Sequence, residues 1–289
     1  MSRSYCSRNV LLVILAVLAF SLSGLAQAPA CTNINCWKYS GATGPASWAT
    51  LTPWATCDPA TSPYTQQSPI NIPTNASQAA SLGPISFSYN NSTVEVEDNG
   101  HTIEADYASS TGTSWANHIT YNGKKYNLMQ FHVHLQSEHT LSTNGTPTQY
   151  AMELHLVHQA QLPEGPGETD PKGALLVISV LINGGGTTDN AMITKITDAL
   201  SSHKPADSVN PTQLLPNSGS PNKNNYYTYP GSLTTPPCST GVTWLVLTNQ
   251  ITIPTTQLAL FTPYYTKNNN RPVQTTITGL NLQQSNIPQ

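Results

Sequence analysis

Three histidines in this sequence are spaced so that their imidazoles could bind one metal ion. His132 and His134 alternate with apolar residues, and His155 lies in a second segment, 151–157, that alternates in the same way. Side chains of a β-strand point to opposite faces in turn, so His132 and His134 share a face. If the two strands pair, the three imidazoles converge. Three neutral histidines with one open position are typical of a catalytic zinc site, whereas a structural site is closed by a fourth protein ligand.

The neighbours of these histidines support a metal site. Gln130 shares a face with His132, and Glu153 shares a face with His155. A ligating imidazole usually donates its other ring N–H to such a side chain, which fixes the orientation of the ring. A lone histidine in a strand is more often simply packed or hydrogen-bonded, and we expect this of His158, which lies on the opposite face from His155.

Short alternating segments predict the sheet that must carry these histidines. Strand patterns occur at 85–89, 93–97 and 102–107, and the turn residues between them predict a meander. The two histidine strands are expected at 126–135 and 149–158. The connection between them contains an Asn-Gly pair, which indicates a hairpin.

The remaining patterns predict one mainly β domain. A continuous apolar segment at 174–182 is typical of a central strand buried on both faces. Apolar residues at helical spacing predict a helix over roughly 189–203, and 241–247 is a further strand. No repeat or linker divides the chain. We expect an α+β, mainly β fold, a single domain built on a large twisted, mostly antiparallel sheet with a few short peripheral helices.

The first thirty residues have the organisation of an export signal. Two arginines precede a short apolar stretch, which is followed by small residues. We expect residues 1–30 to be a signal peptide, cleaved after Ala26 or Ala30, and residues 31–289 to form the mature domain, secreted or periplasmic. The apolar stretch is short for a membrane span, so no integral membrane segment is expected in the mature chain. An uncleaved N-terminal anchor is the alternative.

Four cysteines remain after such a cleavage, namely Cys31, Cys36, Cys57 and Cys238. An even number in an exported chain predicts disulfides and leaves three connectivities open. A lipid anchor on Cys31 is a less favoured alternative, because the residues before it match a bacterial lipoprotein signal poorly. Charged residues make up only 9% of the chain and form no basic run, so nucleic acid is not expected as a partner.

Several segments together resemble the alpha-class carbonic anhydrases. The resemblance runs from about Trp37 to Pro272 and covers nearly the whole mature chain. The matching segments, in family order, include Gln67-Ser68-Pro69-Ile70-Asn71-Ile72, Asn99-Gly100-His101, Gln130-Phe131-His132-Val133-His134, Ser137-Glu138-His139-Thr140, Glu153-Leu154-His155, Gly231-Ser232-Leu233-Thr234-Thr235-Pro236-Pro237 and Asn270-Arg271-Pro272. Each segment is weak alone, but their occurrence in this order is very specific.

The resemblance implies a zinc enzyme that hydrates carbon dioxide reversibly to bicarbonate and a proton. His132, His134 and His155 would be the zinc ligands, and a zinc-bound hydroxide would attack the carbon of CO2. That zinc lowers the pKa of bound water to about 7 is a known property of carbonic anhydrases, not an inference from these residues. The expected partner is therefore a small molecule, CO2 or bicarbonate.

The family pattern also assigns roles to two threonines and one acid. Thr234 would donate its single hydroxyl proton to Glu138, which leaves only acceptor lone pairs facing the metal. Thr235 and the backbone N–H of Thr234 would hold the substrate or the bicarbonate. The apolar wall of the CO2 site would consist of Val157, Leu176, Leu233, Val242 and Trp244.

The resemblance matches His101 to the proton shuttle, a role that suits imidazole because it titrates near neutrality. An ordinary exposed turn histidine remains the alternative. Cys57 and Cys238 match the disulfide of exported family members, and a local bridge is expected between Cys31 and Cys36.

Two other classes of function are less well supported. A non-catalytic binding protein with a carbonic anhydrase-like fold would be signalled by a lost ligand, but all three histidines, Glu138 and Thr234 are present. A zinc hydrolase acting on peptides would carry a His-Glu-x-x-His helix, which this sequence lacks.

Overall fold

The computed structural model describes residues 36–51, 54–60, 66–76, 82–107, 116–160, 174–216, 224–265, 267–274 and 281–285. The expected signal peptide and Cys31 lie outside these ranges. None of the helices within them combines the length and hydrophobicity needed to span a membrane.

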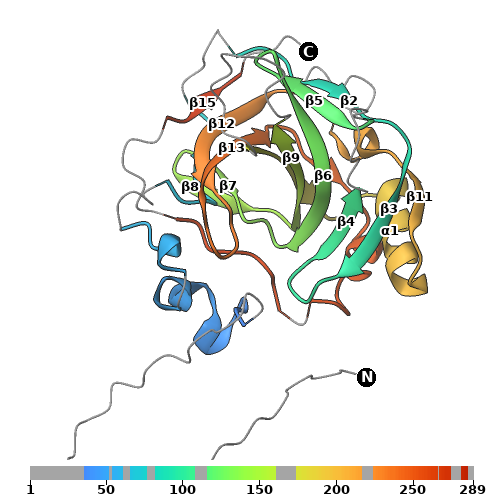
Figure 1. Cartoon of the computed structure of the whole chain (residues 1–289), viewed down its shortest axis with the longest axis horizontal. Coiled ribbons are helices and arrows are strands. Elements are labelled where there is room, and N and C mark those ends of the chain that lie inside the picture. Colours follow the sequence, from blue (N-terminus) through green and yellow to red (C-terminus); the bar gives the residue numbers. More distant parts are fainter. Residues whose placement is uncertain are drawn as a thin grey trace, which may run out of the picture.

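One twelve-stranded sheet organises the described chain (Figure 1). Its strand order is β11-β3-β4-β6-β9-β10-β13-β12-β15, with β14 beside β10 and with β5 joining β2 to β6. Neighbouring strands are antiparallel except where β10 pairs with β13 and β14. The strands are β2 (Ser86–Ser88), β3 (Ser92–Asp98), β4 (Ile103–Tyr107), β5 (His118–Tyr121), β6 (Lys124–Leu135), β9 (Met152–Ala160), β10 (Leu175–Asn183), β11 (Ala206–Val209), β12 (Tyr226–Ser232), β13 (Thr240–Leu247), β14 (Ile251–Thr252) and β15 (Gln283–Gln284).

A second sheet and a few short helices surround the large sheet. The second sheet has the order β1-β7-β8, formed by β1 (Asn71–Pro73), β7 (Thr140–Thr143) and β8 (Thr146–Gln149). The expected hairpin turn joins β7 to β8, because Asn144 and Gly145 both adopt positive φ, as a two-residue type I′ turn requires. The helices are η1 (Gly41–Thr43), η2 (Pro45–Thr50), η3 (Ala55–Cys57), α1 (Ala191–Ser202), η4 (Pro211–Leu214) and α2 (Thr255–Ala259).

Alternation along the central strands separates two apolar clusters. The even-numbered residues of β9 and β10, such as Leu156 and Ile178, pack with Ile196 of α1 in the larger cluster. The odd-numbered Val177 and Leu181 pack in a second cluster with Trp244 of β13. Because side chains alternate along β9 and β10, one face of these strands packs against α1, and the other face is left for the histidines.

The structure confirms the predicted mainly β class, but the predicted meander is wrong in one pairing. β3 pairs with β4 as expected, whereas β2 pairs with β5. The reason lies in the residues after β2. The backbone N–H of Asn90 donates to the side chain of Asn117, and the Asn90 amide donates to Ala116 O, so the chain is tied to the start of β5.

Candidate metal centre

The pairing of β6 with β9 brings the three predicted histidines together. His132 lies directly opposite His155 in this antiparallel ladder, and His134 lies opposite Glu153. The alternation of both strands then directs all three imidazoles to one face of the sheet. The sequence prediction that these strands are neighbours and that the histidines converge is confirmed.

The three rings face one another with one nitrogen each. His155 Nδ1 lies 3.2 Å from His132 Nε2 and 3.2 Å from His134 Nε2. His134 and His155 are buried, while His132 keeps some contact with solvent. Loss of solvation lowers the pKa of all three imidazoles, and the two neighbouring rings lower the pKa of His132 further. Burial therefore favours the neutral form of these imidazoles, whose lone pairs are available to a metal.

The second nitrogen of each ring faces an acceptor, which settles the tautomers. These contacts are His132 Nδ1 to Gln130 Oε1 at 2.8 Å, His134 Nδ1 to Asn269 O at 2.7 Å, and His155 Nε2 to Glu153 Oε1 at 2.8 Å. Each imidazole must donate to its acceptor, so the converging nitrogens carry no proton. Such a set of three nitrogen donors with oriented rings fits a zinc ion.

Glu153 is itself fixed by several donors. Its Oε2 accepts from the backbone N–H groups of Glu138 and His139, and its Oε1 accepts from Ser179 Oγ at 2.6 Å. Burial acts to raise the pKa of Glu153, but His139 and His155 outweigh it and hold the pKa well below the usual range. Glu153 is therefore an ionised, rigid acceptor for His155.

Glu138 is buried beside Glu153. Its Oε1 accepts from the backbone N–H of Arg271 at 2.8 Å and lies 3.5 Å from His134 Nδ1. Burial raises the pKa of Glu138 to about 7 against the lowering effects of His155, Arg271 and Thr234. The Oε2 atom has no partner with full hydrogen-bond geometry among the described residues, although the Thr234 hydroxyl lies near enough to lower the pKa of the Glu138 carboxyl.

The predicted apolar wall is largely brought together, with one correction. Val157, Leu233, Val242 and Trp244 all belong to the cluster on the metal-centre face. Leu176 lies in the cluster on the opposite face, so its placement in the wall was wrong. Leu176 pairs with His158, which is buried on the same face, as expected. Val177 instead pairs with Val157 and with Trp244. Val177 therefore takes the position expected of Leu176.

A disulfide anchors the segment that carries Thr234 and Thr235. Cys57 and Cys238 are bonded, and the backbone N–H of Cys238 donates to Thr235 O at 2.8 Å. The predicted pairing of these two cysteines is confirmed. Cys36 is also disulfide-bonded.

Removing the Cys57–Cys238 bridge is expected to destabilise the fold. The bridge joins residues 181 positions apart, and closing so long a loop stabilises the folded state by roughly 3–5 kcal/mol in the chain-entropy model. The double variant Cys57→Ala/Cys238→Ala leaves the other bridge intact, and urea unfolding measures its loss of free energy. An unfolding free energy equal to that of the unaltered protein would contradict this account.

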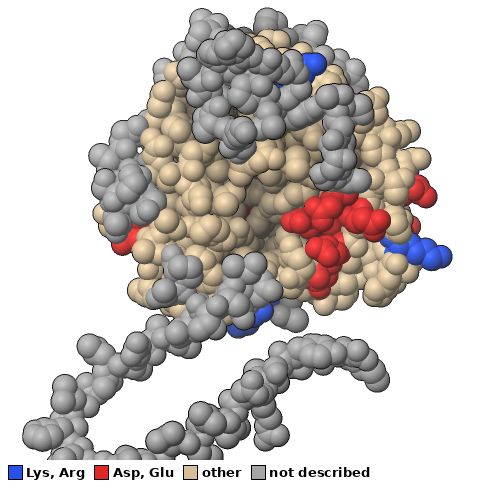
Figure 2. All heavy atoms as spheres, in the orientation of Figure 1, with Lys and Arg blue, Asp and Glu red and all other residues tan. Residues whose placement is uncertain are grey.

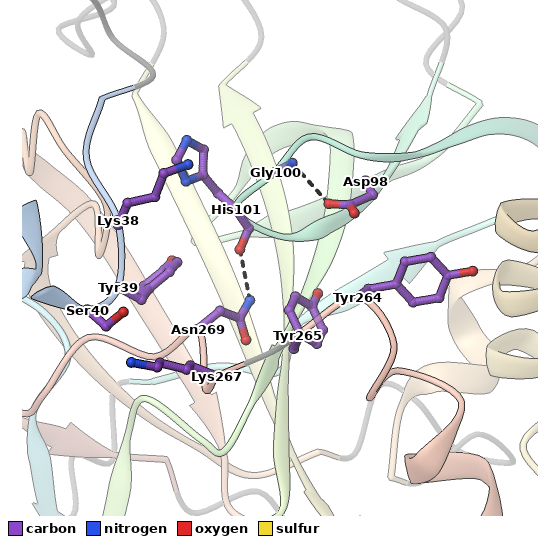
Figure 3. A pocket seen from close by; sticks show the side chains of 10 residues that line it. All are labelled: Lys38, Tyr39, Ser40, Asp98, Gly100, His101, Tyr264, Tyr265, Lys267 and Asn269. Carbon is purple, nitrogen blue, oxygen red and sulfur yellow. Dashed lines mark hydrogen bonds between the residues drawn. The ribbon is translucent and has the colours of Figure 1, made fainter. Parts of the chain in front are cut away.

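His101 lies apart from the three converging histidines. Its ring stacks on Trp37 with 3.7 Å between ring centroids and 10° between planes. It lines a cavity of about 200 Å³ with Lys38 and Asp98 (Figure 3). Burial, then the charge of Lys38, lowers the pKa of His101 to about 4, although Asp98 opposes this. The ring is therefore a stacked, neutral imidazole in this conformation, rather than a freely exposed turn histidine.

Sequence reasoning missed one part of the centre, the backbone carbonyl of Asn269. The side chain of Asn269 also connects the centre to neighbouring segments. Its Nδ2 donates to His101 O and Val133 O, and its Oδ1 accepts from Leu135 N. A carbonyl has no signature in an amino-acid sequence. The only available signal was the matched segment that starts one residue later, at Asn270.

Comparison with known proteins identifies the family. A family model described as eukaryotic-type carbonic anhydrase matches residues 43–283. The carbonic anhydrase of Klebsiella pneumoniae is 34% identical over 255 residues, covering 88% of this chain and 93% of its own length, and that of Neisseria gonorrhoeae is 35% identical over 275 residues, covering 92% and 93%. The solved structure of the alpha-carbonic anhydrase of Thermovibrio ammonificans with sulfanilamide has a TM-score of 0.68 and 32% identity, covering 86% of this chain and 98% of its own. The chain therefore belongs to the eukaryotic-type, or alpha, carbonic anhydrase family.

Proposed function

We propose that this protein is a zinc-dependent carbonic anhydrase, which converts carbon dioxide and water reversibly to bicarbonate and a proton. The observation that carries the proposal is the convergence of His132 Nε2, His134 Nε2 and His155 Nδ1 with every second ring nitrogen facing an acceptor. The relatives that bear the name carbonic anhydrase support the reaction. The intact ligand set argues against a non-catalytic binding protein.

Three imidazoles would hold zinc and leave one coordination position open to the reaction. Zinc in such a site supplies a Lewis acid that favours ionisation of water at neutral pH. The protein keeps its ligands neutral by burial and fixes their orientation through Gln130, Glu153 and the Asn269 carbonyl.

Thr234 and Glu138 would together ensure that a hydrogen-bond acceptor faces the reacting group. Glu138 receives the Arg271 N–H at Oε1 and keeps Oε2 without a well-aligned partner. The hydroxyl of Thr234 can donate its one hydrogen bond to that Oε2, and its lone pairs then accept a hydrogen bond from the attacking group. Thr235 and the Thr234 N–H would hold the substrate or the bicarbonate beside it.

The apolar side chains around the centre would receive carbon dioxide. Val157 and Val177 lie opposite each other on neighbouring strands, and Trp244 lies beside Val177 on the next strand. Together with Leu233 and Val242 they form part of one cluster on the metal-centre face. An apolar wall excludes water from the carbon of CO2, whereas the threonines supply the hydrogen bonds that bicarbonate needs.

Chelation tests the proposal as a whole. CO2 hydration measured by stopped flow should fall to the uncatalysed rate when a chelator strips the metal, and one equivalent of zinc per chain should restore it. Hydration that persists after complete metal removal would overturn the zinc mechanism.

His101 is proposed as the group that passes the proton to solution, from a conformation in which its ring is more exposed than in the stack on Trp37, because burial in that stack lowers its pKa to about 4. Replacing it by alanine should lower kcat in weak buffer by up to about a hundredfold, the scale of a positioned proton-transfer group. It should leave kcat/KM nearly unchanged, because hydration precedes this transfer. Added imidazole should restore much of the loss. If kcat in weak buffer does not change, the proton leaves by another path and His101 serves only to stack on Trp37.

Export is proposed from the N-terminal pattern, with residues 1–30 as a cleaved signal peptide, 31–289 as the mature domain and a location outside the cytoplasm. The Cys57–Cys238 bridge supports this location, because such bonds persist in oxidising compartments. Mass spectrometry of the exported protein should find a mature N-terminus after Ala26 or Ala30. A chain that retains Met1 would contradict cleavage, and a lipid on Cys31 would favour the anchor instead.

A further inference from the structure

Glu104 connects strand β4 to the His132 side of the metal centre. It lies directly opposite His132 in the antiparallel pairing of β4 with β6. Its Oε2 accepts a hydrogen bond from Gln130 Nε2 at 3.0 Å, and Gln130 Oε1 lies 2.8 Å from His132 Nδ1. We propose that Glu104 is a positioning residue of the metal centre, which determines the end of the Gln130 amide that faces His132. This inference rests on the zinc site proposed above.

The two ends of the Gln130 amide differ in their hydrogen bonding. A glutamine side chain has an oxygen that accepts and an NH2 group that donates, so it can face an imidazole in either sense. With Oε1 toward His132, Nδ1 must carry the proton and Nε2 is free to bind a metal. With the amide reversed, Nδ1 would accept and the proton would move to Nε2, where it blocks the metal. A carboxylate at Glu104 accepts hydrogen bonds, so it selects the first orientation.

The other two histidines do not need such a device. His134 donates to the backbone carbonyl of Asn269, which cannot act as a donor. His155 donates to Glu153, an ionised carboxylate fixed by Ser179 and by neighbouring N–H groups. His132 alone relies on a partner that can reverse, and both this partner and Glu104 are partly exposed. The orientation of Gln130 is therefore the least constrained part of the centre.

Glu104 belongs to a cluster of three acidic side chains, whose mutual repulsion disfavours their close approach. Its carboxylate lies with those of Glu97 and Asp106 within 4.8 Å, and acidic side chains gather beside the central hollow of this face in Figure 2. Like charges this close destabilise a sheet. Retaining an unfavourable cluster at this place is typical of a functional constraint.

The test measures zinc affinity rather than activity. The zinc dissociation constant of the full-length protein is determined by competition with a chromophoric chelator. Glu104→Ala should weaken zinc binding roughly tenfold, the lower end of the range for residues that orient a ligand. The matched control is Glu97→Gln, which removes a charge from the same cluster but does not contact Gln130, and its zinc affinity should stay within about twofold. If Glu104→Ala folds poorly, Glu104→Gln, which keeps the side-chain length, should show a loss in the same direction.

A double-mutant cycle tests whether Glu104 acts through Gln130. Gln130→Ala should weaken zinc binding by itself, and adding Glu104→Ala to it should cause no further loss, because the connection is already broken. A purely structural or long-range electrostatic role would make the two losses multiply.

The outcomes separate this inference from the proposed function. If the unaltered protein binds zinc tightly and Glu104→Ala and Glu104→Gln bind it equally tightly, the role of Glu104 is wrong and the proposed function stands. The same holds if the losses of zinc affinity caused by Gln130→Ala and Glu104→Ala multiply in the double variant. Failure of the unaltered protein to bind zinc would overturn the proposed function and this inference with it.

Discussion

Replacing His134 by alanine is expected to abolish zinc retention and CO2 hydration together. His134 is buried and offers one of the three histidine nitrogens that converge on the site in the described part of the chain. The other histidine that lies close by among the described residues is His139, and both of its ring nitrogens face other partners, Glu153 Oε1 at 2.7 Å and Tyr229 Oη at 2.6 Å. Two remaining imidazoles would hold zinc too weakly for the metal to survive purification, so the hydration rate should fall to background. Metal analysis and stopped-flow hydration on one sample measure both effects.

The control for this variant is His118→Ala, because His118 is a strand histidine of β5 outside the metal centre. It should retain one zinc per chain and the hydration rate. Far-UV circular dichroism must show that both variants are folded. A folded His134→Ala protein with stoichiometric zinc and an undiminished rate would show that the ligand assignment is wrong.

Replacing Thr234 by alanine should keep zinc but lower the hydration rate on the order of a hundredfold, the usual effect of deleting one positioned hydrogen-bonding group at a reacting centre. Zinc should remain because Thr234 does not belong to the converging ligand set. The rate should fall because Glu138 then loses the hydroxyl that links it to the reacting group. Zinc content and kcat/KM, measured together, distinguish this result from loss of the metal.

Thr234→Ser is the matched variant, since it retains the hydroxyl and removes only a methyl group. It should recover most of the rate that Thr234→Ala loses. Equal rates in the unaltered, serine and alanine proteins would dismiss the proposed role of the hydroxyl.

The histidine strands could be predicted from sequence because polar and apolar residues alternate in them. The period of two assigned His132, His134 and His155 to their faces, and the pairing of β6 with β9 confirms it. The contacts of Gln130 and Glu153 with two of these histidines were visible for the same reason, since each shares a face with the histidine that it contacts.

The face on which Leu176 lies could not be predicted from its own strand. Strand β10 is apolar from Leu175 to Ile182 except for Ser179, so it has almost no alternation to read. Ser179 was the available signal: its side chain donates to Glu153, which places the odd-numbered residues, including Val177, on the metal-centre face.

Contacts between distant segments were beyond prediction. Strand β12 contains Pro230 and Gly231, which disfavour a strand, yet it pairs along its length with β13. Glu104 could be read only as a polar strand residue, because its contact with Gln130 depends on the register between β4 and β6. The family resemblance supplied the roles of Thr234 and Glu138, for which local pattern gave no signal.

The most direct test of the central claim is to measure zinc content and CO2 hydration on the same sample of the purified, unaltered protein. Convergence of three neutral imidazoles predicts one zinc per chain and hydration far above the uncatalysed rate, with both lost together on chelation. A folded protein with no zinc, or with zinc and only the background rate of hydration, would contradict the account.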